Sequence, residues 1–169
     1  MNKRFLHLFP LLALAVATPG YAAEQAQQSA RAPAAEGPAL KLAVQAAQVA
    51  IAACAAADGQ TIAVSVVDSA GVLKVLLAAD GTSQRGVTSS TAKALTALHY
   101  QKDTQQLFER VNDDEAFAAE IAANPSFNAR PGGIVIRSGD RIIGALGVGG
   151  GRTDHECGLA GLEKIADRL

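Results

Sequence analysis

Three residues with ligand-binding side chains lie in a row on one predicted helix. Lys93, Thr96 and His99 follow one another at intervals of three residues, so a cation, a hydroxyl group and an imidazole share one side of the helix. Such a row could bind a carboxylate through Lys93 and a metal through His99. Alternatively, Lys93 is a solvated charge and His99 is a cation at the end of a helix, where the helix dipole favours positive charge.

Other polar residues indicate sites less clearly. The hydroxyl groups of residues 88–91 lie at a predicted helix start and form a plausible anion site, because helix N-termini attract anions. His155 lies between Asp154 and Glu156, but three consecutive helical residues point in different directions. Polarity at a helix start therefore explains them better than a metal site. No Ser-His-Asp or Cys-His-Asn arrangement can be assigned from spacing, so the sequence leaves enzymatic activity undecided.

The aromatic residues that follow the N-terminal segment are clustered between positions 100 and 127. They are Tyr100, Phe108, Phe117 and Phe127. Such a cluster can form the wall of a slot for a flat ligand, or it can be the local core beneath short helices.

Cys54 and Cys157 are the only cysteines. Both fall on predicted helices, and if these helices are neighbours, one disulfide would close a loop of about 100 residues. Two buried free thiols are the alternative. A C-x-x-C redox motif is absent.

Composition favours one ordinary globular domain. The chain has 169 residues, of which 49% are hydrophobic and 18% charged. Because 15 basic residues face 16 acidic ones, no charge pattern points to a nucleic acid or an anionic membrane. The only Met is at position 1 and Trp is absent, which excludes thioether ligands and indole stacking from the folded part.

The N-terminus has the pattern of a secretory signal peptide. Two basic residues precede an apolar run at 6–16, and small residues follow up to position 23. The run is too short to span a membrane, which needs about 20 apolar residues, and no cysteine follows it that could carry a lipid anchor. A buried N-terminal helix is the alternative, but it would carry Pro10 in its interior. We expect a cleaved signal peptide over 1–23 and export to the periplasm or the medium.

The rest of the chain divides into a leader and a domain. Residues 24–38 are rich in Ala, Gln and Pro, which is typical of a flexible leader, and the domain spans 39–169. Apolar periodicity and turn residues predict helices and strands in this order: helix 40–58, strands 61–67 and 72–78, helices 87–100, 103–111 and 113–123, strands 134–137 and 141–148, and helix 154–169. Hairpins pair strands antiparallel and the helices come in blocks, so the class is α+β with a single antiparallel sheet flanked by helices, in the order α-ββ-αα(α)-ββ-α.

Several segments resemble one protein family. They are Ala63–Gly71 (AVSVVDSAG), Lys93–Ala97 (KALTA), Pro131–Gly133 (PGG) and Gly144–Gly150 (GALGVGG). In this order they are similar to the haem-binding family of the GlcG and HbpS type, whose domain also occurs fused to some corrinoid adenosyltransferases. The resemblance implies an antiparallel sheet of about five strands, a pocket partly lined by the helix that carries Lys93, and assembly into homo-oligomers.

The resemblance also implies a function and a site. The protein would be an exported one that sequesters haem and can support its oxidative degradation. Lys93 and Thr96 lie in the matched segment and would hold the porphyrin. His99 lies outside that segment; its place in the same helical row makes it a further porphyrin contact and the candidate ligand of the haem iron. Arg130 would bind a propionate, and Gly147 would let the backbone approach the ligand.

Two other functions stay open. One is a binding module or accessory subunit for a small organic acid or a corrinoid, without haem; the hydroxyl groups at 88–91 motivate it. The other is a structural oligomer with a degenerate pocket.

Overall fold

The structure is a computed structural model that describes residues 34–169. The predicted signal peptide and most of the predicted leader lie outside the described residues. The elements are, in chain order, α2 (Leu40–Asp58), β1 (Ala63–Asp68), β2 (Leu73–Ala78), α3 (Gln84–Tyr100), α4 (Thr104–Asp113), α5 (Glu115–Ala123), β3 (Gly133–Ser138), β4 (Arg141–Gly149), α6 (Asp154–Glu163) and the short 3-10 helix η1 (Ala166–Arg168). The predicted α+β class and the predicted order of elements are confirmed.

The sheet has four strands in the order β2-β1-β4-β3, and every neighbouring pair is antiparallel. The expectation of about five strands is therefore wrong. In the described chain, α4 and α5 occupy the segment between α3 and β3. Residues 34–38 also fail to add a strand: the Ser69 amide donates a backbone hydrogen bond to the Glu36 carbonyl oxygen, but Pro38 soon follows and has no N–H to continue a ladder.

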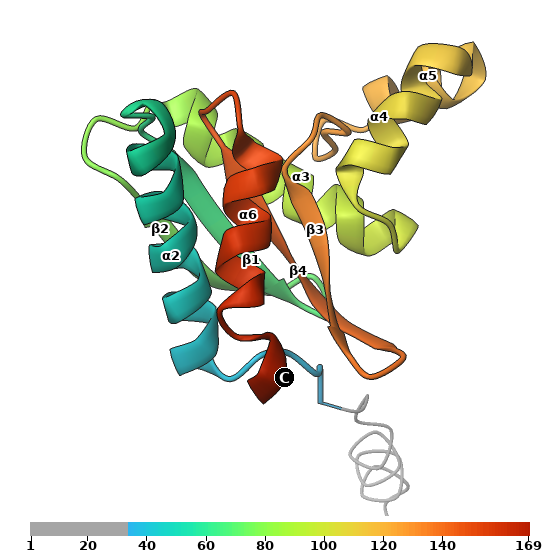
Figure 1. Cartoon of the computed structure of the whole chain (residues 1–169). Coiled ribbons are helices and arrows are strands. Elements are labelled where there is room, and N and C mark those ends of the chain that lie inside the picture. The colour runs from blue at the N-terminus through green and yellow to red at the C-terminus, as the bar shows by residue number, and fades with distance from the viewer. Residues whose placement is uncertain (1–33) are drawn as a thin grey trace, which may run out of the picture. The chain divides into compact units, whose positions relative to one another are not determined.

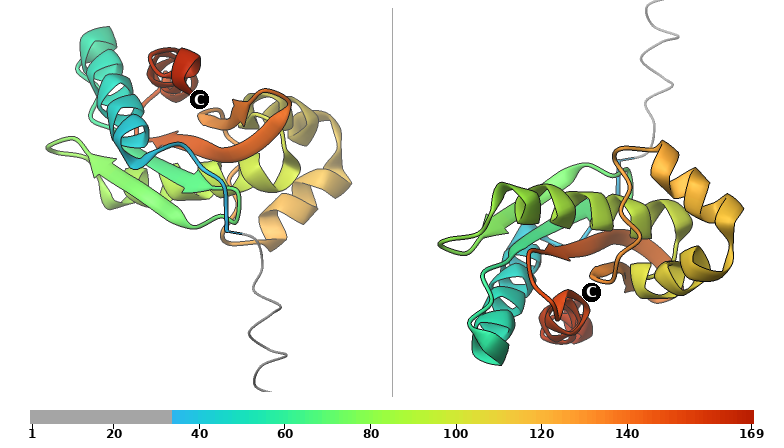
Figure 2. Two further views of the ribbon diagram at one scale, coloured as in Figure 1. Left: turned by 90° about the horizontal axis from the view of Figure 1, so that it is seen from below. Right: turned by 90° about the horizontal axis from the view of Figure 1, so that it is seen from above.

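Helices cover both faces of the sheet. Helices α2 and α6 lie side by side on one face and α3 lies on the other, while α4 and α5 form a pair at the β3 side (Figure 1; Figure 2). Each face has its own buried cluster. The larger cluster lies between the sheet and the α2–α6 pair, and a smaller one, which includes Val67, Ala94 and Ala145, lies beneath α3.

Small residues let α2 pack closely on α6. Helix α2 buries a stripe that includes Ala43, Ala47 and Ala50, and Gly161 of α6 lies against the backbone of this helix. By length and composition α2 could also cross a membrane; in this structure its alanine stripe is buried against the rest of the fold. The sulfur atoms of Cys54 and Cys157 are 2.11 Å apart in a disulfide that joins the two helices.

Glycines of β4 let α3 lie directly on the sheet. A Cβ atom on Gly147 would overlap the Ser90 carbonyl oxygen and stand 2.7 Å from the Ala94 amide nitrogen. A Cβ on Gly149 would stand 2.6 Å from the Ser90 amide nitrogen. The backbones of β4 and α3 are therefore in contact, and this contact fixes where Lys93 lies.

Candidate ligand-binding site

A cavity of about 470 Å³ opens beside the first half of α3. Its wall comes from α3, from the loop before β3 and from the turn between β4 and α6. The polar residues of the wall include Arg85, Ser89, Lys93, Asn128, Arg130 and Asp154. We refer to this space as the Lys93 cavity.

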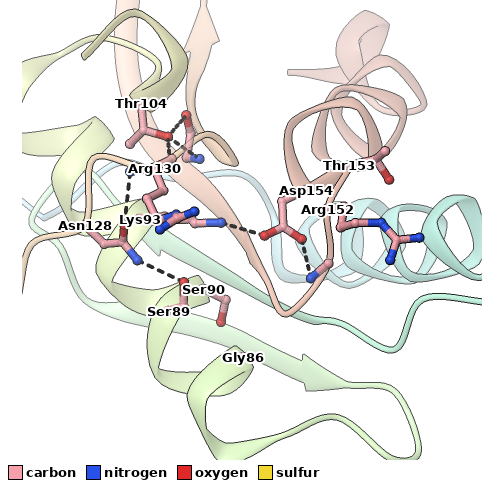
Figure 3. Close-up of polar contacts among 12 residues, drawn as sticks. Gly86, Ser89, Ser90, Lys93, Thr104, Asn128, Arg130, Arg152, Thr153 and Asp154 are labelled. Carbon is pink, nitrogen blue, oxygen red and sulfur yellow. Dashed lines mark hydrogen bonds and ion pairs between the residues drawn. The ribbon is translucent and has the colours of Figure 1, made fainter. Parts of the chain in front are cut away.

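The charged pair of this cavity is Lys93 with Asp154 (Figure 3). The Nζ–Oδ2 distance is 2.6 Å, and the two side chains are 5% and 7% exposed. The other oxygen of Asp154 accepts a hydrogen bond from the Gly151 amide at 2.9 Å. Burial lowers the pKa of Lys93; the Asp154 charge and hydrogen bond act in the opposite direction, and Arg130 adds to the lowering.

Asn128 organises the loop that carries Arg130 (Figure 3). Its backbone N–H donates to Thr96 Oγ1 at 2.7 Å, and its side-chain Nδ2 donates to Ser89 Oγ at 3.0 Å. Its side-chain oxygen accepts from the Arg130 amide at 3.0 Å, and the Arg130 carbonyl oxygen accepts from Thr104 Oγ1 at 2.8 Å. The loop is thus tied to α3 and α4, and Arg130 is held on the cavity wall.

The predicted row along α3 is divided between two environments. Lys93 lies in the cavity with Arg130. Thr96 is fully buried, and its hydroxyl both donates to the Ala92 carbonyl oxygen and accepts from Asn128. His99 is exposed and lines a neighbouring cavity of about 400 Å³.

Phe127 separates the two cavities. It lines both of them, and its ring centroid lies 4.8 Å from that of His99. Phe117, in contrast, is buried beneath the short helices. Of the four clustered aromatic residues, Phe127 is therefore the one that lines both cavities.

Gly147 is not on the wall of the Lys93 cavity. It is buried beneath α3, where the Ser90 carbonyl oxygen leaves no space for even a Cβ atom. Its place in the structure is to let β4 and α3 touch.

The sequence predicts that the hydroxyl cluster at 88–91 lies at a helix start. In the structure it lies inside α3 instead. Helix α3 begins earlier, at Gln84, because the Ser83 side chain caps it by accepting a hydrogen bond from the Gly86 amide. Thr88 Oγ1 donates to the Gln84 carbonyl oxygen within the helix, and Ser90 contacts the buried Ser65 hydroxyl at 2.8 Å. These hydroxyl groups therefore do not form a helix N-terminal anion site.

No metal cluster is present in the described part of the chain: residues 34–169 contain no group of three or more His, Cys, Asp or Glu side chains that could hold a metal ion. His155 Nδ1 is buried without a hydrogen-bond partner, but His155 is not on the wall of the Lys93 cavity.

Two residues of the site, Asp154 and Asn128, are not predicted from the sequence. The sequence around Asp154 indicates only a polar helix start, yet in the structure its carboxylate contacts Lys93, 61 positions away in the chain. An available signal was its position directly after the glycine-rich end of β4. Nothing in the sequence around Asn128 indicates the bonds that it makes.

The comparisons with known proteins agree with this fold. The model of the family "Haem degrading protein HbpS-like" matches residues 39–163. The crystal structure of HbpS is 25% identical and has a TM-score of 0.70; the match covers 80% of this chain and 94% of HbpS. A double mutant of Streptomyces reticuli HbpS is also 25% identical and has a TM-score of 0.70; the match covers 92% of this chain and 99% of that protein.

A third structure shares the fold at lower identity. The PduOC:heme complex is 20% identical, with a TM-score of 0.69 and coverage of 76% of this chain and 95% of PduOC. No protein with a curated description matches the chain. The family match spans most of the described residues. The chain therefore belongs to the HbpS-like family of haem-degrading proteins.

Proposed function

We propose that the protein binds haem, with the haem carboxylates in the Lys93 cavity. The observation that carries this proposal is the family match over residues 39–163. The shared fold of PduOC, whose solved structure is a haem complex, supports it. Oxidative degradation of the bound haem, as the family description suggests, is part of the proposal.

The charges of the cavity suit the propionates. Its wall carries three cationic side chains, Arg85, Lys93 and Arg130, against one carboxylate, Asp154. Arginine binds carboxylates through paired hydrogen bonds, and both arginines are exposed enough to move toward a ligand. Arg85 and Arg130 would therefore hold the propionates.

The iron ligand must come from outside this wall. Among the described residues that line the Lys93 cavity there is no His, Cys, Met or Tyr, the usual axial ligands. His99 lies in the neighbouring cavity, on the far side of Phe127. Phe127, which lines both cavities, would contact the porphyrin, and His99 would be the side chain available to hold the iron. Bound haem would supply the redox chemistry, while these residues bind and orient it.

A haemin titration of the purified protein, followed by absorbance, tests this function. We expect saturation near one haem per chain, a changed Soret band in His99→Ala, and weaker binding in Arg130→Ala. Arg137→Ala is the matched control, because Arg137 is exposed on β3 and outside the Lys93 cavity. Absence of saturable binding would overturn the proposal, and an unchanged spectrum in His99→Ala would remove His99 as the iron ligand.

Export and self-association belong to the same proposal. The disulfide between Cys54 and Cys157 suits an oxidising compartment, in line with the signal-like N-terminus.

Strand β2 is an edge strand, and the exposed apolar residues Val72, Leu73 and Leu76 lie on or beside it, which suits contact with a second copy. N-terminal sequencing of the exported fraction and light scattering of the purified protein test the two points.

A small organic acid is the second candidate ligand. The observation that favours it is that the wall of the Lys93 cavity combines an excess of cations with no axial ligand for iron.

A further inference from the structure

The Lys93 ammonium group makes fewer contacts than it can. It carries three N–H donors, and in the described structure its one hydrogen bond goes to Asp154 Oδ2 at 2.6 Å. Its Nζ atom lies close to Gly132, so one side is packed, and the residue also lines the cavity. The ammonium group therefore has donors that Asp154 does not use, on a residue that lines the cavity.

The surroundings select an anion. Arg85 and Arg130 add two positive charges to that of Lys93, whereas Asp154 is the one carboxylate on the wall. The whole chain has a net charge of −1, so this excess of positive charge is local. A ligand that carries a carboxylate is attracted to the cavity and can be held there by an arginine.

The pair of Lys93 and Asp154 has the parts for carbonyl chemistry. A neutral lysine amine is a nucleophile toward carbonyl carbon. Burial lowers the pKa of Lys93 and so shifts it toward the neutral form, while the charge and hydrogen bond of Asp154 act in the opposite direction. Asp154 touches the ammonium group and is placed to accept its proton. The amine, the proton acceptor and the carboxylate-binding arginine lie on one wall.

We propose that the Lys93 cavity binds a small 2-oxo carboxylic acid and that Lys93 captures its carbonyl carbon as an imine. Asp154 takes one proton from the ammonium group, and the free amine attacks the carbonyl carbon. The hydroxyl group of the resulting carbinolamine leaves as water with the proton that Asp154 returns. The balance is ammonium plus ketone to protonated imine plus water, with no change in oxidation state. Arg130 and Arg85 hold the carboxylate.

This inference goes beyond haem binding and does not depend on it. A haem propionate and a 2-oxo acid would compete for Arg130, but imine formation needs neither iron nor porphyrin. The two proposals therefore fail separately. A protein that binds haem and forms no imine would refute only this inference.

Reductive trapping is the direct test. The purified protein is incubated with pyruvate and sodium borohydride, digested and mapped by mass spectrometry. We expect a carboxyethyl group on Lys93 in preference to the exposed residues Lys41, Lys102 and Lys164, which serve as internal controls. Lys93→Arg, which keeps the positive charge beside Asp154, should lose the adduct.

Two further variants test the roles of the neighbours. Arg130→Ala should raise the pyruvate concentration for half-maximal trapping about tenfold, the loss expected for one charge-assisted hydrogen bond, whereas Arg137→Ala should leave it unchanged. Asp154→Asn should slow trapping. Because Arg130 is exposed, its variant will fold even if a change at Lys93 does not. Adducts spread evenly over the exposed lysines, or trapping insensitive to Arg130→Ala, would overturn the inference.

Discussion

Lys93 of α3 and Asp154 of α6 form a buried ion pair between helices on opposite faces of the sheet. Their Nζ–Oδ2 distance is 2.6 Å, although the residues are 61 positions apart in the sequence. The pair thus links the two helical layers at the cavity. Its burial makes it sensitive to the loss of either partner, because a charge left alone in a low-dielectric site is costly.

Replacing Asp154 alone with Leu should destabilise the fold by about 3–5 kcal/mol, because Lys93 would stay buried without its partner. Replacing both residues, in Lys93→Met with Asp154→Leu, should recover most of that loss, since an apolar pair needs no compensating charge. Urea unfolding of the two single variants and the double variant measures the coupling. If the loss of stability in the double variant equals the sum of the losses in the two single variants, the two charges do not stabilise each other.

Local patterns in the sequence predict much of this fold. The alanine stripe of α2 has helical periodicity, and Gly59, at φ 62°, ends that helix where the sequence places its end. Alternating apolar residues on either side of Asp68 and Gly71 likewise predict the first hairpin, which forms. Such signals arise from residues that are close together along the chain, so they can be recognised in the sequence alone.

The site depends on relationships that the sequence does not display. A helix turns about 100° per residue, so each step of three falls about 60° short of a full turn, and Lys93 and His99 end up about 120° apart. Thr96, between them, is buried while His99 is exposed. Likewise, only the packing of α6 on the sheet brings Asp154 to Lys93. Spacing alone therefore does not show that Lys93 and His99 line two different cavities.

Gly147→Ala should be among the most damaging of the small substitutions. The new methyl group would overlap the Ser90 carbonyl oxygen and crowd the Ala94 amide, both of which are backbone atoms of α3 that cannot turn aside. We expect a loss of about 3 kcal/mol in the free energy of unfolding, the upper part of the range for overpacking. Gly139→Ala is the control: its position has a φ of 59° and open space around it, so about 1 kcal/mol is expected. Similar losses in thermal unfolding of both variants would contradict direct contact between β4 and α3.

Reducing the disulfide should lower stability by about 4 kcal/mol, because Cys54 and Cys157 close a loop with a sequence separation of 103. The measurement is denaturant unfolding with and without a reducing agent. A variant with both cysteines replaced by alanine should already be destabilised and should not respond to the reductant. If the original protein is equally stable in both conditions, the disulfide does not constrain the unfolded chain.

The hydrogen bond from Tyr100 to Glu120 should make stability depend on alkaline pH. Burial, and then the Glu120 hydrogen bond and charge, raise the pKa of Tyr100 from 10.0 to about 12. The folded protein therefore keeps the phenol proton to a higher pH than the unfolded chain does. This contribution to stability is fully present below pH 10 and is lost as the pH rises from 10 to about 12. In Glu120→Gln, which removes the charge, the pKa of Tyr100 should fall and the decline over this range should shrink. Ultraviolet titration of tyrosinate, with Tyr100→Phe as the reference, measures the pKa, and an unchanged titration in Glu120→Gln would show that burial alone sets it.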